Sequence, residues 1–388
     1  MIPMVSATVD TGALQHNLQA VRQWAPHSRI MAVIKANAYG HGLVAAARAL
    51  ESADSFAVAR VDEGLTLRAA GIHKSTVLLE GVFDREQLDA AAAAGFELVV
   101  HTAEQIELLR AAKADAAPKA DVADVAGEAG AAARADAVGA GAAVGFKVWL
   151  KLDSGMNRLG FKGAAFDAAL KTLSAMPGAV QSPVNLFTHL ASADSPELSA
   201  TTEQLARFAQ ATASLPGERS IANSAGMLSF PESQADWVRP GLLLYGVSPF
   251  SGTIGADYGL KAAMTLHSHV IAVKDLAPGE HVGYGGDWTA RRPARLAVAA
   301  VGYGDGYPRN LASGSPVLVN GTRAPLAGRV SMDMIGIDVT DLPRPPRLGD
   351  PVVLWGAGLP VEEIAVWANT IPYELLCGIS QRVAVSYR

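Results

Sequence analysis

Lys35 occupies a position suited to amine chemistry. The residues before it, Met31 to Ile34, are apolar and are predicted to form a buried strand. A lysine at the end of such a strand carries its ammonium toward a dry environment, which costs free energy unless the amine is used. Burial lowers the pKa of an amine and leaves a nucleophile that can form a Schiff base with a carbonyl compound. An ion pair at the rim of a barrel is the alternative use of such a lysine.

Other polar side chains also follow apolar runs. They lie at a predicted strand end or in the short loop after it, and they are Arg158, His189, Asn223, Ser224 and Arg239. The carboxyl ends of parallel strands meet at one face of a barrel, and active sites of barrel enzymes lie there. These residues are therefore expected to gather with Lys35.

The elements that would position them form a repeating pattern. Ala/Leu-rich stretches with helical spacing, such as Leu43 to Leu50 and Ala103 to Ala111, separate short apolar runs, and Thr102 is typical of a helix start. This alternation predicts a (β/α)8 TIM-like barrel over residues 1–248. A doubly wound sheet is the alternative, but no Gly-x-Gly-x-x-Gly turn follows the first strand. The predicted strands lie near 30–35, 55–59, 76–82, 96–100, 147–153, 184–190, 219–222 and 242–247.

The remaining residues, 249–388, have a different pattern. Short alternating runs separated by Gly, Pro and Asp predict a mostly β C-terminal domain. One helix is expected at Val361 to Asn369, after Pro360 and with acidic residues in its first turn. The Ala/Gly/Asp-rich stretch from Lys113 to Gly145 has almost no large apolar residue and is interpreted as an expanded surface loop.

Composition limits the class of protein. The 388 residues suggest two domains, and 50% hydrophobic with 18% charged residues fits a globular enzyme. The net charge of −5 provides no basic stripe for nucleic acid. Cys377 is the only cysteine, so no intrachain disulfide can form, and the start of the chain does not have the pattern of a signal peptide. No apolar run is long enough to span a membrane. A cytoplasmic protein without a membrane or nucleic-acid partner is expected.

Several blocks resemble the alanine racemase family, keep its order and cover nearly all of the chain. They are Ala32-Val-Ile-Lys-Ala-Asn-Ala-Tyr-Gly-His-Gly42, Lys151-Leu-Asp-Ser-Gly-Met-Asn-Arg-Leu-Gly160, Phe187-Thr-His-Leu-Ala191, Asn223-Ser224, Arg239-Pro-Gly241, Val282-Gly-Tyr-Gly285, Val301-Gly-Tyr-Gly-Asp-Gly-Tyr-Pro308, Ser331-Met-Asp333 and Tyr373-Glu374. The resemblance implies a homodimer that interconverts L- and D-alanine through a pyridoxal 5'-phosphate aldimine by a two-base mechanism. The D-alanine formed would be used for peptidoglycan synthesis. Alternatively, the reaction would serve the catabolism of alanine.

The resemblance also implies how the cofactor is held. The lysine that forms the Schiff base with the cofactor would be Lys35. The hydroxyl of Ser224 and the backbone N–H groups near Gly241 and Leu242 would bind its phosphate, because hydroxyls and turn N–H groups suit anions. Tyr39 and Tyr373 would add phenolic hydroxyls at the same place. Without the family, each tyrosine reads as an amphipathic core residue.

Arg239 would face the ring nitrogen of the cofactor. A guanidinium only donates hydrogen bonds, so the ring nitrogen would stay unprotonated and the ring would be a weaker electron sink. His189 is expected to hydrogen-bond near Arg239, and Asn223 belongs to the cofactor-binding set. No metal site is predicted.

Inversion at carbon needs a base on each face of a planar intermediate. The resemblance implies Lys35 for one face and Tyr284 of the partner subunit for the other, although Tyr284 alone reads as an aromatic residue at a hairpin edge. Arg158 would bind the cofactor phenolate oxygen and the substrate carboxylate, and the backbone N–H of Met332 would be a second carboxylate donor.

Two further residues are expected to support the site. Lys151 matches a lysine that is carbamylated in several racemases, and an ordinary ammonium is the alternative. Asp333 would orient neighbouring groups. A racemase of broader specificity, acting on serine or lysine, is an alternative function, and a non-catalytic pyridoxal-phosphate carrier is disfavoured because such proteins are single barrels.

Overall fold

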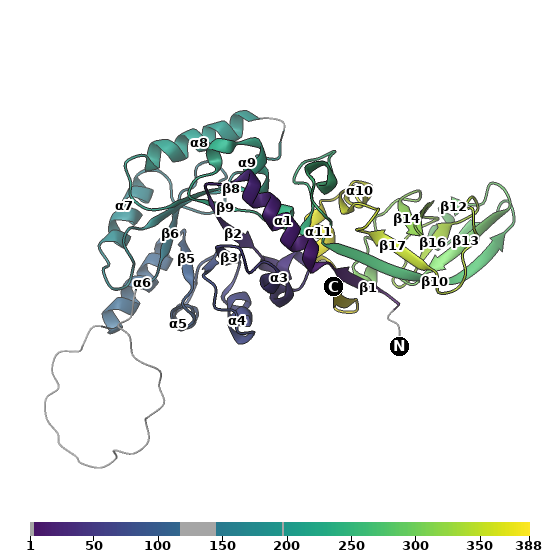
Figure 1. Cartoon of the computed structure of the whole chain (residues 1–388), viewed down its shortest axis with the longest axis horizontal. Coiled ribbons are helices and arrows are strands. Elements are labelled where there is room, and N and C mark those ends of the chain that lie inside the picture. The colour runs from purple at the N-terminus through teal and green to yellow at the C-terminus, as the bar shows by residue number, and fades with distance from the viewer. Residues whose placement is uncertain (1–3, 117–144, 196–197) are drawn as a thin grey trace, which may run out of the picture.

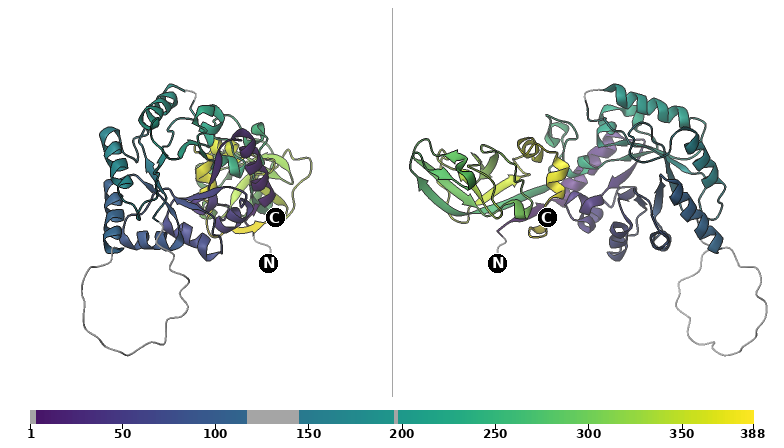
Figure 2. Two further views of the ribbon diagram at one scale, coloured as in Figure 1. Left: turned by 60° about the vertical axis from the view of Figure 1, so that its left-hand side comes forward. Right: turned by 180° about the vertical axis from the view of Figure 1, so that it is seen from behind.

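The structure is a computed structural model that describes residues 4–116, 145–195 and 198–388. It has two parts, a barrel and a smaller, mainly β part, placed side by side along the long axis of the molecule (Figure 1). The two further views in Figure 2 show the same elongated arrangement. The two parts predicted from the sequence are therefore present.

Eight parallel strands close into the predicted barrel. Each strand pairs with the next in chain order, and the first closes onto the last. Nearly every residue in these strands is buried, which agrees with their continuous apolar character, because both faces of a parallel barrel are covered. The strands are β2 (Arg29–Val33), β3 (Ser55–Val58), β4 (Thr76–Leu78), β5 (Glu97–Val100), β6 (Val148–Lys151), β7 (Asn185–Phe187), β8 (Arg219–Asn223) and β9 (Trp237–Arg239).

The eighth strand was placed wrongly by the sequence. The prediction put it at 242–247, but the strand is β9, and Leu242–Tyr245 forms the 3-10 helix η2. This run is fully buried and ends at Gly246 in a left-handed conformation, with φ 78°. A short apolar run does not by itself distinguish a buried strand from a buried helical turn. In consequence, Arg239 is the last residue of a strand and stands at the barrel rim.

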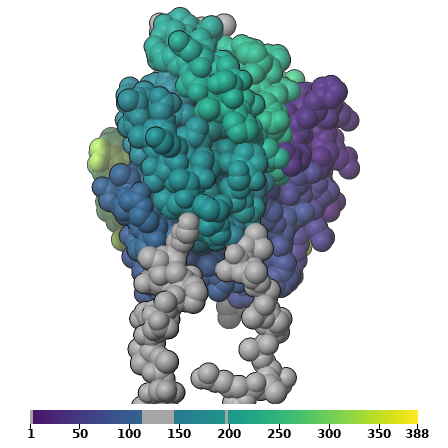
Figure 3. All heavy atoms as spheres, turned by 90° about the vertical axis from the view of Figure 1, so that its left-hand side faces the viewer, coloured from purple at the N-terminus to yellow at the C-terminus, as the bar shows by residue number. Residues whose placement is uncertain are grey.

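The barrel helices have polar caps that explain where they begin. The Asp10 carboxylate accepts a hydrogen bond from the Ala13 N–H (3.0 Å) at the start of α1, and the Asp84 carboxylate accepts one from the Gln87 N–H (2.8 Å) at the start of α5. Residues from the later part of the barrel sequence, in teal, make up much of the face of the molecule shown in Figure 3. No helix in the described part of the chain has the length and apolar character that a membrane span requires. The helices are α1 (Thr11–Trp24), α3 (Leu43–Ala49), α4 (Val61–Ala69), α5 (Arg85–Ala94), α6 (Ala103–Ala116), α7 (Gly163–Ser174), α8 (Leu198–Thr212) and α9 (Ser224–Ser229).

The Ala-rich stretch from Lys113 to Gly145 falls mostly outside the described residues. Its first residues form the end of α6, and residues 117–144 are not among those that the structure describes. The interpretation of this stretch as a surface loop therefore stays a prediction.

The second part is a mostly antiparallel sheet, as predicted. Its longest strand, β10, has 13 residues and pairs with three others, β1, β13 and β17. The predicted helix near Val361 is confirmed as α10 (Val361–Trp367), preceded by Pro360, and α11 (Pro372–Cys377) follows it. The remaining elements of this part are β1 (Ser6–Val9), β10 (Met264–Leu276), β11 (His281–Val282), β12 (Trp288–Thr289), β13 (Ala294–Ala299), β14 (Pro316–Val319), β15 (Thr322–Pro325), β16 (Ile335–Asp338), β17 (Pro351–Trp355) and β18 (Ala384–Tyr387).

The first strand of the chain belongs to the second sheet and not to the barrel. In β1, Ser6 pairs with His267 of β10 on one side and with Ala384 of β18 on the other. The N-terminal strand thus lies between two C-terminal ones. Sequence reasoning placed residues 1–248 together and did not anticipate this exchange.

The end of the chain returns to the turn after β2. A Cβ atom on Gly40 would lie 2.1 Å from the carbonyl oxygen of Leu376 in α11, and one on Gly42 would lie 2.0 Å from the Tyr387 hydroxyl of β18. Glycine is needed at Gly40 because the two backbones approach so closely, and both positions have a positive φ, 79° and 90°, that favours glycine. The segment that carries Lys35 is therefore in contact with the C-terminal elements of the same chain.

Candidate active site

The carboxyl ends of the barrel strands hold most of the candidate residues. Lys35 follows β2, and His189 follows β7 by two residues. Lys151, Asn223 and Arg239 are the last residues of β6, β8 and β9. The structure therefore places these side chains at one face of the barrel, the face at which barrel enzymes carry out chemistry.

Lys35 is followed by a turn of unusual hand. The four residues from Ala36 to Tyr39 have φ angles of 52° to 54°, so α2 (Lys35–Tyr39) is a turn of left-handed helix. This conformation costs roughly 1–2 kcal/mol per residue for L-amino acids, and runs of it are rare. The Glu63 carboxylate accepts hydrogen bonds from the Ala36 N–H (2.6 Å) and the Ala59 N–H (2.7 Å), and so fixes the start of the turn.

The turn delivers Tyr39 into an aromatic cluster. The Tyr39 ring lies 4.8 Å from the ring of Tyr245 and 5.6 Å from that of Tyr373. Burial raises the pKa of Tyr39, and burial together with Asp194 raises the pKa of Tyr373 to about 12. Both phenols therefore stay protonated near neutral pH and can donate a hydrogen bond to an anion.

Gly241 completes the same corner of the barrel. A Cβ atom there would lie 2.6 Å from the Tyr39 hydroxyl, so only glycine leaves room for the phenol. The Ser224 hydroxyl, itself buried, accepts a hydrogen bond from the Gly241 N–H (2.9 Å), and Leu242 begins η2 beside it. The hydroxyls of Tyr39 and Ser224 thus both lie beside Gly241, and hydroxyls at a turn of the backbone suit a phosphate.

Asn223 has a structural part in this corner. Its side-chain oxygen accepts a hydrogen bond from the Gly226 N–H (2.9 Å) and so caps α9. Its nitrogen donates weakly to the Leu190 carbonyl oxygen (3.4 Å). Asn223 therefore orients the short helix that begins with Ser224.

Arg239 is almost completely buried and firmly anchored. It is 3% exposed, and its guanidinium donates hydrogen bonds to the Ser220 hydroxyl (2.7 Å) and to the carbonyl oxygens of Thr188 (2.7 Å) and Ile221 (3.0 Å). Burial lowers its pKa to about 9, so the group remains a cation at neutral pH. A cation held in this way has one orientation and can only donate hydrogen bonds.

His189 is paired with Arg239, as expected from the sequence. The Arg239 guanidinium donates to the Nδ1 atom of His189 (3.3 Å), and it also lies over the Phe187 ring at 3.9 Å. Burial and the nearby Arg239 charge lower the pKa of His189 well below its usual value. The imidazole is therefore neutral and acts as an acceptor for the arginine.

Lys151 is buried in positive surroundings. It is 6% exposed, and its ammonium lies 5.7 Å from the Phe187 ring. Burial, followed by the charges of Arg239 and Arg158, lowers its pKa to about 8. A fraction of this amine is therefore unprotonated near neutrality, which is the form that reacts with carbon dioxide.

Arg158 stands exposed on the loop after β6. The loop is shaped by Asp153, whose carboxylate accepts hydrogen bonds from the N–H groups of Gly155 and Asn157 (both 3.0 Å). The Arg207 side chain of α8 donates to the Ser154 carbonyl oxygen from outside (3.2 Å).

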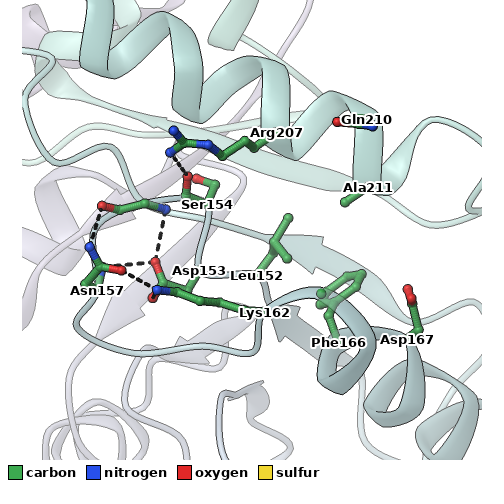
Figure 4. Close-up of a pocket in the computed structure, with 12 residues that line it drawn as sticks. Leu152, Asp153, Ser154, Asn157, Lys162, Phe166, Asp167, Arg207, Gln210 and Ala211 are labelled. Carbon is green, nitrogen blue, oxygen red and sulfur yellow. Dashed lines mark hydrogen bonds and ion pairs between the residues drawn. The ribbon is translucent and has the colours of Figure 1, made fainter.

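Behind this loop lies a cavity of about 590 Å³ (Figure 4). It is lined by residues of the loop, α7 and α8, such as Asp153, Phe166 and Gln210, and not by Lys35 or Arg239. The cavity is therefore separate from the cluster at the barrel mouth.

Tyr284 and Met332 are not brought to Lys35 within one chain. Tyr284 is 70% exposed and Met332 is 53% exposed, and both belong to the second part of the molecule. Tyr284 lies between β11 and β12, a hairpin at the end of the molecule away from the barrel (Figure 1). Within one chain, Tyr284 is therefore an exposed phenol on a turn between two glycines, away from the cluster at the barrel mouth.

The loop of Met332 is held by its neighbours. The Gly304 N–H donates to the Met332 carbonyl oxygen (2.9 Å). Arg382 binds the Asp333 carboxylate (2.8 Å) and lies 3.4 Å from that of buried Asp305. Asp333 is thus held by an arginine that sequence reasoning missed, and its orienting part stays a prediction.

Other contributors were also missed. They are Glu63, which fixes the turn after Lys35, Ser220, which holds Arg239, and Tyr245, which packs on Tyr39. None of these three residues lies in a sequence block for which a catalytic or cofactor-binding role was predicted. The carboxylate of Glu63, four residues after the end of the strand predicted at 55–59, was the one signal available.

Comparisons with known proteins agree with this geometry. The model of the alanine racemase N-terminal domain matches residues 9–249, and that of the C-terminal domain matches residues 263–387. The chain is 46% identical to alanine racemases of Yersinia pestis over 386 residues, 98% of each chain, and 46% identical to that of Aeromonas hydrophila over 385 residues, again 98% of each.

Solved structures give the same result. The biosynthetic alanine racemase from Pseudomonas aeruginosa superposes with a TM-score of 0.88 at 42% identity, over 100% of both chains. The alanine racemase from Bartonella henselae with covalently bound pyridoxal phosphate superposes with a TM-score of 0.84 at 30% identity, also over 100% of both chains.

Proposed function

Since the chain belongs to the alanine racemase family, we propose that Lys35 and Tyr284 are the two bases with which it interconverts L- and D-alanine. The family depends on pyridoxal 5'-phosphate, which supplies an electron sink for the α-carbon when it is bound. The reaction serves D-alanine supply for peptidoglycan or the catabolism of alanine.

The barrel mouth fits this cofactor. Lys35 would hold it covalently. The corner formed by Gly241 without a side chain and by the buried Ser224 hydroxyl suits its phosphate, together with Tyr39 and Tyr373. Leu242, His189 and Asn223 complete the proposed cofactor-binding set, His189 and Asn223 by orienting other groups.

Arg239 would face the ring nitrogen. Its guanidinium is fixed by three protein oxygens and keeps its charge, so it donates a hydrogen bond and does not accept a proton. With the cofactor bound, a donor of this kind would leave the ring nitrogen unprotonated, and Arg239 would thereby favour return of a proton to the α-carbon over side reactions.

The substrate carboxylate would be bound by two donors. Arg158 is an exposed guanidinium at the barrel mouth, and guanidinium geometry matches a carboxylate. The backbone N–H of Met332, on the loop held by Arg382, would be the second donor. Lys151 and Asp333 support these two, Lys151 either as an ammonium or as a carbamate.

Protons would move at two atoms. The Lys35 amine would take or give a proton on one face of the α-carbon, and the Tyr284 phenol oxygen on the other. Because a phenol ordinarily titrates near pH 10, Tyr284 needs positive surroundings, and the cationic barrel mouth of a second chain would provide them.

The exposure of Tyr284 is the observation that carries this proposal. Within one chain it lies far from Lys35, on the other part of the molecule (Figure 1). A two-fold dimer in which the second part of each chain covers the barrel mouth of the other would bring the two bases together, with two composite sites. We therefore assign the barrel within residues 1–248 to a cofactor-binding domain, and residues 249–388, with β1 in their sheet, to a domain that completes the partner's site. The single cysteine, Cys377, is in keeping with a cytoplasmic location.

A mixed-dimer experiment tests the composite site. Homodimers of Lys35→Ala and of Tyr284→Phe are each expected to be nearly inactive. In a mixed dimer one site carries both lesions and the other carries neither. Random exchange of equal amounts makes about half of the dimers mixed, so activity should return to about a quarter of wild type.

The control uses two chains that share a lesion. Lys35→Ala refolded with the double variant Lys35→Ala/Tyr284→Phe should recover nothing, because no chain supplies the lysine. Confirmed heterodimers of the two single variants that stay inactive would show that Tyr284 does not act at the partner's lysine.

A further inference from the structure

The left-handed turn after Lys35 needs support from outside itself. It is closed by hydrogen bonds from the Ala38 N–H to the Ile34 carbonyl oxygen (2.9 Å) and from the Gly40 N–H to the Ala36 carbonyl oxygen (3.1 Å). Its four residues with positive φ all carry a Cβ atom, which disfavours this hand. The same backbone turned right-handed would aim Tyr39 elsewhere, so contacts beyond the turn must select the left-handed form.

The Glu63 carboxylate fixes the start of the turn, and the imidazole of His41 makes the contacts at its end. Its Nδ1 atom lies 3.0 Å from the carbonyl oxygen of Ala38 and 2.9 Å from that of Tyr39. Both partners are acceptors, so Nδ1 carries the hydrogen and donates to both. The His41 side chain is completely buried, and its Nε2 atom has no hydrogen-bond partner among the residues that the structure describes. The hydrogen bonds from Nδ1 to the two carbonyl oxygens therefore set the position of the ring.

The ring is in turn fixed to the strand before Lys35. It stacks on Tyr245, with ring centroids 4.5 Å apart and planes 29° apart. The Tyr245 hydroxyl donates to the carbonyl oxygen of Val33, the last residue of β2 (2.9 Å). Burial lowers the pKa of His41 to about 4, so the ring is neutral and its single N–H is present at neutral pH.

We propose that His41 is a positioning residue for Lys35. By donating its Nδ1–H to the Ala38 and Tyr39 carbonyl oxygens, it holds the turn left-handed and ties it through Tyr245 to β2. The turn then sets the directions of the Lys35 amine and the Tyr39 hydroxyl together. This inference rests on the proposed function for the role of Lys35, while the hold on the turn is independent of it.

Three substitutions of one residue separate the hydrogen bond from mere filling of space. His41→Asn keeps a side-chain N–H close to where Nδ1 lies, His41→Gln moves it about one bond further out, and His41→Leu removes it. In the purified enzyme, His41→Leu and His41→Gln should weaken cofactor binding and lower kcat by about tenfold, the size of one net hydrogen bond. His41→Asn should recover both to within about threefold of wild type.

Two readouts do not depend on turnover. Hydrogen exchange of the Ala38 and Gly40 amides in the cofactor-free protein should be about tenfold faster in His41→Leu and close to wild type in His41→Asn. The visible circular dichroism of the bound cofactor should change in His41→Leu but not in His41→Asn. As a control, Leu354→Ala, buried in β17, should lower the unfolding temperature and leave both readouts unchanged.

Two results would overturn the inference. One is unchanged amide exchange and cofactor dichroism in folded His41→Leu, and the other is a folded His41→Asn that behaves like His41→Leu. A different measurement tests the proposed function. If Lys35→Ala kept the absorbance band of covalently bound cofactor, Lys35 would not be the residue that binds the cofactor. The exchange measurement would still decide whether His41 holds the turn.

Discussion

Replacing Lys151 by methionine is expected to stabilise the cofactor-free protein at neutral pH, although it alters the active site. The Lys151 ammonium is 6% exposed, and burial with the charges of Arg239 and Arg158 lowers its pKa from 10.5 to about 8. A lowered pKa for a base means that the folded state resists its protonation. At pH values below the pKa of Lys151 in the folded protein, the amine is fully protonated and its buried charge opposes folding.

The size and sign of the effect follow from the two pKa values of Lys151. Between about pH 8 and pH 10.5 the unfolded chain binds more protons than the folded one, so stability rises with pH in this window. Below it the penalty is constant, at about 3 kcal/mol, since each unit of pKa corresponds to about 1.4 kcal/mol. Methionine has a similar length and no charge, so it avoids the penalty.

Urea unfolding of the cofactor-free proteins in buffer free of carbon dioxide measures this. Lys151→Met should be more stable than wild type by about 3 kcal/mol at pH 7 and by about 1 kcal/mol or less at pH 10. Lys171→Met, at an exposed position of α7, is the matched control and should change little at either pH.

A Lys151→Met protein that is no more stable than wild type at pH 7 would refute the reasoning. Bicarbonate then distinguishes the two forms of Lys151 considered above. If the amine adds carbon dioxide, forming an N–C bond and releasing a proton, an anion replaces the cation. Wild type but not Lys151→Met should then gain stability with bicarbonate.

Two further substitutions test residues that the sequence did not single out. Ser220→Ala removes a buried acceptor of the Arg239 guanidinium and should lower the free energy of unfolding by about 2 kcal/mol, measured in urea, and a loss below about 0.5 kcal/mol would contradict the assigned hydrogen bond. Arg382→Met breaks the contact with Asp333 that holds the Met332 loop, and should raise the KM for alanine several-fold. It should also lower the free energy of unfolding by about 1–2 kcal/mol, because the exposed Asp333 pair contributes little but the buried Asp305 carboxylate loses a cation at 3.4 Å. An unchanged KM in steady-state assays would show that the loop does not need Arg382.

Much of the barrel was predictable from residue patterns. Seven of its strands lie within or next to the predicted runs, because strands covered on both faces must be apolar. The eighth failed because Leu242–Tyr245 is equally apolar but is wound into a 3-10 helix. The exchange of β1 into the second sheet also escaped prediction, since pairing partners more than 250 residues apart leave no local pattern.

The positions of several candidate site residues along the barrel were predictable, but the local geometry around them was not. Lys35 and Arg239 could be placed at strand ends, and that is where they lie. The left-handed turn was not foreseen, because Ala36 to Tyr39 contain no glycine and only long-range contacts select their conformation. The exposure of Tyr284 could not be foreseen either, since it depends on how the whole chain folds.

The placement of β1 has a consequence for how this protein emerges from the ribosome. Ser6 pairs with His267, 261 residues later, and with Ala384, 378 residues later. At roughly 5–20 residues per second, the first strand waits on the order of 10 to 50 seconds for its first partner. During that time it is an unpaired strand that other chains can capture. For the same reason, a fragment cut at residue 248 would carry a strand without a sheet, and the complementary fragment would have a gap between β10 and β18. The barrel and the second sheet are distinct in space, but neither fragment expressed alone is expected to fold as it does in the whole chain.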